Sequence, residues 1–148
     1  MATRSTVPTV RAALVALLSA RPALANVQVS YSHPGDALEH ESIFLGDMRA
    51  TAELATVRAG RRTRNESYTI DVWVEVNSDG PTAQTCEERA WTLLGELEDQ
   101  LADDATLGLT QPFWAVLAEA EESVYFDDAK RGFVARIRAG VRCEARLT

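Results

Sequence analysis

The clearest pattern in the chain is a strict alternation of apolar and polar residues from Gly132 to Leu147. A period of two places successive side chains on opposite faces of a β-strand, so this stretch predicts a strand with one buried and one solvated face. The apolar face would carry Phe133, Ala135, Ile137, Ala139, Val141, Cys143, Ala145 and Leu147. At about 3.3 Å per residue the strand would be on the order of 45 Å long, whereas strands usually have about 5–6 residues. We therefore expect the sheet to reach beyond its own domain.

A second alternating stretch begins at Ser67. One face would carry Tyr68, Ile70, Val72, Val74 and Val76, and the other Thr69, Asp71, Trp73 and Glu75. A less polarised strand over 48–57 precedes it, and the polar loop between the two predicts an antiparallel hairpin with a basic tip. Val27 to Tyr31 and Glu41 to Leu45 read as shorter strands, with a break expected at Gly46-Asp47.

The last hairpin pairs a strand from Phe113 to Tyr125 with the stretch that ends at Leu147, through the turn at 127–132. Glu119 and Glu121 would then lie opposite the arginine face of the final strand. Such cross-strand charge pairs contribute only about 0.2–1 kcal/mol each, but they help to set the register.

Helical spacing appears in two places. A helix capped by Ser5 or Thr6 would end near Arg21 at Pro22, with its stripe packed on the sheet. Its stripe consists of Val7, Val10, Leu14, Leu17 and Leu18. A second helix would start near Pro81. Its inward stripe consists of Cys86, Ala90, Leu93, Leu94, Leu97 and Leu101.

These elements predict one α+β domain over residues 1–148: a mainly antiparallel sheet of long hairpins with two helices packed on one face. The expected element order is α-β-β-β-β-α-β-β. With 148 residues, 46% of them apolar and 25% charged, the chain can bury a single core and is not disordered as a whole.

Net charge bears on nucleic-acid binding, and the positions of the cysteines bear on disulfide formation. A formal charge of −7 argues against non-specific nucleic-acid binding by the whole surface. Cys86 and Cys143 both fall on apolar faces, so we expect reduced core residues rather than a disulfide framework.

The N-terminal stretch also has features of a secretory signal: Arg4 and Arg11, an apolar run over 12–18, and Ala23-Leu24-Ala25 as a small-residue cleavage site. Helical spacing of its apolar residues and the interruption at Arg21-Pro22 favour an amphipathic helix that stays on the protein. The run is too short to span a bilayer, and no membrane partner is expected.

No pattern for catalysis, a cofactor or a metal is apparent. His33 and His40 lie in a turn-rich stretch without the spacing of metal ligands. There is no Gly-x-Ser-x-Gly elbow and no glycine-rich phosphate loop, and a Cys/His pair would need the core cysteines. Neighbouring carboxylates such as Asp103/Asp104 read as solvated charges. We therefore expect no enzyme, no cofactor and no metal.

Two features indicate contact with other proteins. Four arginines fall within seven residues at the predicted hairpin tip: Arg58, Arg61, Arg62 and Arg64. They form either a soluble tip or a docking element for an acidic partner or a phosphate backbone. The second feature is a set of large apolar residues expected on the sheet face away from the helices: Trp73, Phe113, Leu117 and Val134. This face would pack against another subunit unless a helix or loop covers it.

Element order over nearly the whole chain resembles the tail terminator (tail completion) proteins of long-tailed bacteriophages. The resemblance rests on the helix ending at Arg21-Pro22, the long hairpin with its Arg58–Arg64 tip, the acidic helix around Cys86–Leu101, and the final hairpin ending in Val134-Ala135-Arg136-Ile137-Arg138.

The resemblance implies a structural virion protein. It would form a homohexameric ring that caps the head-proximal end of the tail tube, ends tube polymerisation and offers a docking surface to the head. Partners would be the tail tube protein, a head–tail connector or neck protein, and genomic DNA passing through the lumen without specific binding. The protein would be located at the head–tail junction of the virion, and in the host cytoplasm during assembly.

On this hypothesis the four arginines dock the tube or a neighbour, and the Trp73 and Leu117 face packs between subunits. Three alternatives remain open from the sequence: a head–tail connector or neck protein, a small dimeric α+β enzyme or ligand-binding domain, and an envelope or periplasmic binding protein whose mature chain starts at Asn26.

Overall fold

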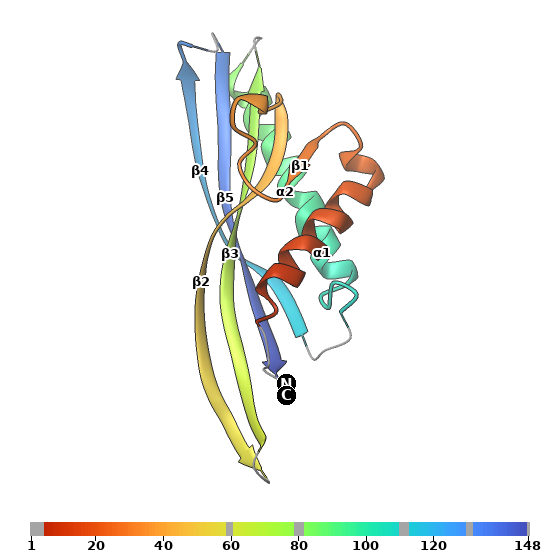
Figure 1. The fold of residues 1–148 in the computed structure, drawn as a ribbon. Helices are drawn as coiled ribbons and strands as arrows, with labels where there is room; N and C mark the ends of the chain where they lie inside the picture. Colours follow the sequence, from red (N-terminus) through yellow and green to blue (C-terminus); the bar gives the residue numbers. More distant parts are fainter. Residues whose placement is uncertain (1–4, 59–60, 79–81, 110–112, 130–131, 148) are drawn as a thin grey trace.

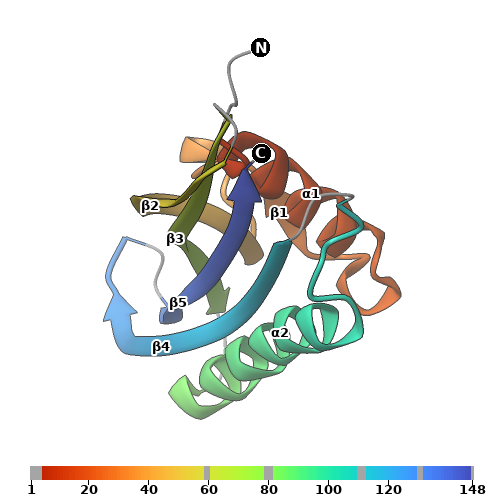
Figure 2. The same cartoon turned by 90° about the horizontal axis from the view of Figure 1, so that it is seen from below.

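The alternating stretches form the strands of one sheet, and the two helical stretches pack together on one of its faces (Figures 1 and 2). The structure is a computed structural model that describes residues 5–58, 61–78, 82–109, 113–129 and 132–147. It describes the backbone alone for residues 51–58, 61–64, 78 and 147. The strands are β1 (Gln28–Ser30), β2 (Glu41–Arg58), β3 (Arg61–Ser78), β4 (Phe113–Asp127) and β5 (Gly132–Leu147). The helices are α1 (Val7–Ala20) and α2 (Ala83–Asp103), with short 3-10 turns at Pro22–Leu24 and Gly35–Ala37.

The strand order in the sheet is β1-β2-β3-β5-β4. β1 is parallel to β2, and the other neighbours are antiparallel. The two long hairpins, β2–β3 and β4–β5, point toward opposite ends of the molecule (Figure 1). The α+β class, the long hairpins and the helices on one face are confirmed.

One detail of the predicted order is wrong. The described elements follow α-β-β-β-α-β-β, because Gly46-Asp47 does not end a strand. Leu45 pairs with Val72 and Met48 with Ile70, so the two intervening residues together face one residue of β3. This is a β-bulge, which bends a strand without ending it. Two predicted strands are therefore one.

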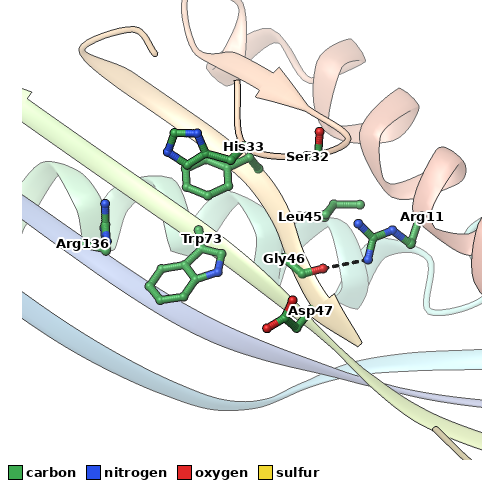
Figure 3. Close-up of a pocket in the computed structure, with 9 residues that line it drawn as sticks. Arg11, Ser32, His33, Leu45, Gly46, Asp47, Trp73 and Arg136 are labelled. Atoms are coloured by element: carbon green, nitrogen blue, oxygen red, sulfur yellow. Dashed lines mark hydrogen bonds between the residues drawn. The ribbon is translucent and has the colours of Figure 1, made fainter. Parts of the chain in front are cut away.

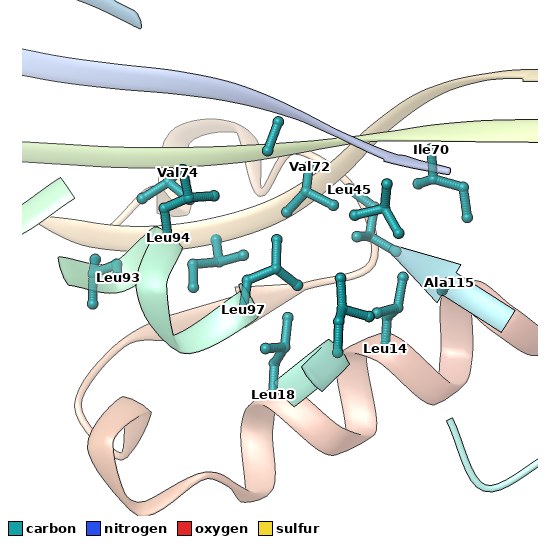
Figure 4. Packing of buried hydrophobic residues seen from close by; sticks show 14 of the residues in the cluster. Leu14, Leu18, Leu45, Ile70, Val72, Val74, Leu93, Leu94, Leu97 and Ala115 are labelled. Atoms are coloured by element: carbon teal, nitrogen blue, oxygen red, sulfur yellow. The ribbon is translucent and has the colours of Figure 1, made fainter. Parts of the chain in front are cut away.

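The core lies between the sheet and the helices (Figure 4). Both predicted helical stripes enter it: Val7, Val10, Leu14, Leu18, Cys86, Ala90, Leu93, Leu94, Leu97 and Leu101 are buried. Leu17 of the predicted α1 stripe is only half-buried and packs against this core. Thr82 begins α2, because its side chain accepts a hydrogen bond from the backbone N–H of Thr85 at 3.1 Å. Thr6 precedes α1, but its hydroxyl is hydrogen-bonded to that of Tyr68 at 2.8 Å. In the described part of the chain, neither helix is long and apolar enough to cross a membrane.

Both cysteines are free and buried, as predicted. Burial raises the pKa of the Cys143 thiol to about 12 and also raises the pKa of Cys86. At pH near 8, the shift of the Cys143 pKa from 9.0 to about 12 lowers the thiolate fraction of this residue by about three orders of magnitude.

We therefore expect both thiols to resist a colorimetric disulfide reagent in the native protein and to react rapidly once the chain is unfolded in urea. The measurement is the rate of thiol release with and without denaturant. Rapid reaction of either thiol in the native protein would contradict the packing described here.

Candidate functional site: the open face of the sheet

The face of the sheet away from the helices, here called the open face, carries a connected group of charged and aromatic side chains. Among the residues on this face are Ser42, Phe44, Arg49, Thr69, Asp71, Trp73, Glu75, Glu119, Glu121, Val134, Arg136, Arg138, Gly140, Arg142 and Glu144. Alternation places these residues there, since their neighbours in sequence fill the core.

An ion pair links the two central strands on this face. Glu75 is completely buried (0% exposed), and Arg136 opposite it on β5 donates to its Oε2 from Nη2 at 2.8 Å and from Nε at 3.1 Å. Burial of a carboxylate is costly unless a charged donor is hydrogen-bonded to it, as Arg136 is here. The pair fixes the guanidinium across the strands.

The same guanidinium begins a row of stacked rings. The Arg136 guanidinium carbon lies 5.4 Å from the centroid of the Trp73 ring, within the range of a cation–π contact. Trp73 stacks on Phe44 of β2 with centroids 6.5 Å apart, and Phe44 meets His33 edge-on at 4.8 Å. The row thus connects β5, β3, β2 and the loop after β1 (Figure 3).

Beside this row lies a cavity of about 430 Å³. Arg11 of α1 closes one side of it. Its Nη1 donates to the Gly46 carbonyl at 2.8 Å and its Nη2 to the Tyr31 carbonyl at 3.2 Å, and its guanidinium lies 4.9 Å from the Tyr31 ring centroid. The cavity is lined by Arg11, Ser32, His33, Phe44, Leu45, Gly46, Asp47, Trp73 and Arg136 (Figure 3).

Gly46, in the bulge of β2, has no side chain, so the Trp73 indole can lie close to the backbone there. A Cβ at this position would come within 2.6 Å of Trp73 Nε1 and 2.8 Å of its Cδ1, closer than real contacts permit. We expect Gly46→Ala to displace the indole and to lower the free energy of unfolding by about 1–3 kcal/mol, measured by urea denaturation.

Gly95→Ala in α2 is the matched control, because its Cβ would meet nothing within 4 Å. It should be neutral or stabilise the protein by up to about 1 kcal/mol, as alanine favours helix. Equal midpoints for the two variants would show that Trp73 is not held against Gly46.

Two further arginines of β5 on this face are also paired. Arg138 donates to Glu121 at 2.7 Å, as the sequence predicted for this hairpin, and Arg142 to Glu144 at 3.3 Å. These pairs are exposed to solvent and add little stability. Their effect is to place opposite charges side by side on this part of the open face.

The histidines take structural roles. His33 Nδ1 accepts a hydrogen bond from the Gly35 N–H at 2.9 Å, and His40 Nδ1 lies 2.7 Å from Asn77 Oδ1. Among the described residues, no three His, Cys, Asp or Glu side chains come together as a metal site would require. The cavity therefore offers aromatic surfaces and cations held by hydrogen bonds.

Of the predicted intersubunit residues, Trp73 lies on the open face and lines the cavity. Phe113 and Leu117 do not share a face with Glu119 and Glu121. Leu117 pairs with Val141 and Glu119 with Gly140, so Ala118 forms a bulge that reverses the alternation. Phe113 consequently belongs to the core, with Leu117 packed against it.

Val134 lies on the open face but is fully buried within the subunit, as Phe113 is in the core. Little of either side chain is left for a second subunit to contact. For the basic tip, the backbone register pairs Arg58 with Arg61 across the hairpin. The side chains of Arg58, Arg61, Arg62 and Arg64 lie outside the described residues.

The cavity itself was not apparent from the sequence. The alternation predicts Trp73 as a large residue on a polar face, but its partners Phe44 and His33 come from a different strand and a loop. The one local signal was Gly46, which reads as a strand break and is in fact where the backbone accepts the indole.

Comparison with solved structures finds a similar fold in a chain of the "Virion of native gene transfer agent (GTA) particle". The TM-score is 0.69 with 14% sequence identity, over 96% of this chain and 98% of that one. The sequence matches no protein-family model and no curated protein. At this identity the likeness establishes a shared fold over essentially the whole length of both chains.

Proposed function

We propose that this protein is a structural virion protein that acts as a tail terminator. It forms a ring, expected to be a homohexamer, on the head-proximal end of a phage tail tube. The ring ends tube polymerisation and presents a docking surface to the head. The observation that carries the proposal is the fold shared over 96% of the chain with a chain of a gene transfer agent virion.

The partners follow from the same proposal: the tail tube protein on one side of the ring and a head–tail connector or neck protein on the other. The protein would lie at the head–tail junction of the virion. In this proposal the open face is turned toward the lumen. The ion pairs Arg136–Glu75, Arg138–Glu121 and Arg142–Glu144 then support passage of DNA without binding, because these three arginines are already paired with carboxylates.

Tail length tests this function. Tail tube protein of the same phage would be polymerised in vitro with and without the purified protein, and tube lengths and ends would be measured by negative-stain electron microscopy. We expect caps on one end only, and no further growth from capped ends. Uncapped tubes that elongate normally at saturating protein would contradict the proposal.

A head–tail connector or neck protein is the neighbouring alternative, since the fold likeness does not distinguish the two roles. A connector would bind tubes that are already terminated and would leave the growth of bare tubes unchanged. The growth assay therefore separates them.

The cavity favours one further candidate, a small dimeric ligand-binding domain, because about 430 Å³ is within the usual range for ligand sites. Native mass spectrometry separates this candidate from the ring. A strict dimer at all concentrations would support the ligand-binding domain, and a hexamer, or a monomer–hexamer mixture that depends on concentration, would support the ring.

A further inference from the structure

Two edges of the sheet carry strands whose outer sides are open over long runs. β1 covers β2 only from Ser42 to Phe44, so among the described strands nothing pairs with the outer side of β2 from Leu45 onward. On the other edge, the Ala115 N–H donates to the Ala105 carbonyl at 2.9 Å. Beyond that point, the described elements include no further strand beside β4. Open edges of this length are sites where another strand can add.

Strand directions make these two edges complementary. β2, β3, β5 and β4 are neighbours in that order and each runs antiparallel to the next, so β4 runs antiparallel to β2. A rotation about an axis roughly along the strands, with the strands tilted to it, preserves strand direction and keeps each face of the sheet on the same side. A second copy placed by such a rotation therefore brings its β2 edge antiparallel to the β4 edge of the first.

We propose that the subunits of the ring join by pairing the β4 edge of one copy with the β2 edge of the next, so that the open faces form one continuous surface. The proposal rests on the proposed ring, and it names the strands that form each junction. It is a head-to-tail contact, and repeated around a closed ring it pairs the open run of every β2 with the β4 edge of a neighbour.

Charge supports this pairing. Arg49 on β2 is 64% exposed at its side chain and lies on the open face, where its contact within the subunit is a 3.8 Å approach to Asp71. The β4 edge carries exposed Glu119 and Glu121 on the same face. Facing residues of opposite charge on paired strands attract, so the arginine of one copy suits the glutamates of the next.

The positions of the open runs require a stagger between copies. The open run of β4 extends from the level of Gly140 toward the β4–β5 turn, while that of β2 extends toward the β2–β3 tip (Figure 1). Placing Arg49 opposite Glu121 shifts neighbours by a few residues along the strands. Closed sheets have such a shift at their junctions because their strands tilt relative to the axis.

Glutamates and bulges on edge strands can also serve to prevent pairing. In that role both edges would repel a second copy. Pairing of the edges and prevention of pairing therefore predict opposite outcomes when copies are cross-linked.

Ala50 and Ala120 are exposed and face each other in the staggered register, with Arg49 opposite Glu121. The full-length Ala50→Cys/Ala120→Cys variant would be treated with a bis-maleimide reaching about 10 Å, equal to about three residues of strand. We expect a ladder of covalently linked species, from the dimer up to the complete ring. The native cysteines should not react with the maleimide, because Cys86 and Cys143 are buried.

The single variants Ala50→Cys and Ala120→Cys are the controls, since a head-to-tail contact leaves each without a nearby thiol. The reaction would be run on the free protein and on protein bound to tail tubes. A hexamer or a capped tube without a ladder would overturn the edge pairing and leave the ring intact. A protein that neither assembles nor caps tubes would overturn the proposed function as well.

Charge exchange gives a second measurement. Arg49→Glu and Glu121→Arg should each weaken assembly, by about fivefold per junction, because like charges then face each other. In an equimolar mixture, alternating copies restore an opposite-charge pair at every junction, so assembly should recover. Failure of the mixture to assemble better than either variant alone would overturn the proposal.

Discussion

Leu97→Asp is expected to abolish folding. Leu97 is completely buried (0% exposed) on the inward face of α2, in the core between that helix and the sheet (Figure 4). The substitution both removes an apolar side chain and places a carboxylate where no water reaches it, which costs several kcal/mol. A domain of this size has about 5–15 kcal/mol of total stability, so little or none would remain. Far-ultraviolet circular dichroism and soluble yield are the measurements.

Two further variants on the same helix serve as comparisons for Leu97→Asp. Leu97→Ala should fold but lose about 2–5 kcal/mol, as expected for a cavity in a packed core. Glu98→Ala, one residue further on and exposed, should change stability by less than about 0.5 kcal/mol. A Leu97→Asp protein that unfolds cooperatively at the wild-type urea midpoint would mean that α2 does not pack as described.

The periodicity of apolar residues in the sequence predicted the helices and strands that have one buried and one solvated face. Leu14 and Leu18 of α1, like Leu93 and Leu97 of α2, follow helical spacing and are buried. The strict alternation of β5 has the same cause. In each case burial is a local property of the element, so it can be read without knowing what packs against it.

A bulge in β4 is the reason that the sequence pattern predicted the wrong face of the sheet for Phe113 and Leu117. The apparent alternation from Phe113 through Glu121 is continuous in sequence, but the extra residue Ala118 moves the two ends of the run to opposite faces. An alanine gives no local signal of a bulge. The bulge follows from pairing with Gly140 on β5, where the Glu119 side chain occupies the space that a Cβ would need.

Tertiary contacts likewise create the open-face site. Arg136 was predicted on the wet side of β5, yet it reaches a fully buried carboxylate, Glu75, on β3. The ring row needs His33 from a loop and Phe44 from β2 to meet Trp73. These residues are far apart in sequence, and single-strand patterns contain no information about which strands become neighbours.

Reversal of the basic tip is the second change with a large expected effect. Replacing Arg58, Arg61, Arg62 and Arg64 with glutamate should leave the fold intact and prevent capping of tail tubes. β2 and β3 continue to the end of this hairpin, with Arg58 paired to Arg61, far from the helices and the core (Figure 1). Four reversed charges on a docking surface convert attraction to repulsion, which costs several kcal/mol of binding. Circular dichroism would report the fold, and electron microscopy of tubes would report capping.

Net charge must be separated from position, because the protein already carries −7. Arg→Gln at the same four positions brings the net charge to about −11, and so does glutamate at four exposed positions of α1, namely Thr9, Ala12, Ala16 and Ser19. If the tip docks the tube, the glutamine variant should cap poorly while the α1 variant caps normally. Equal loss in both would assign the effect to overall repulsion, and normal tails with the reversed tip would exclude the hairpin from docking. The comparison is matched in net charge and differs in position: the backbone of the tip lies at the end of a long hairpin, and the four α1 positions lie on the solvated side of that helix.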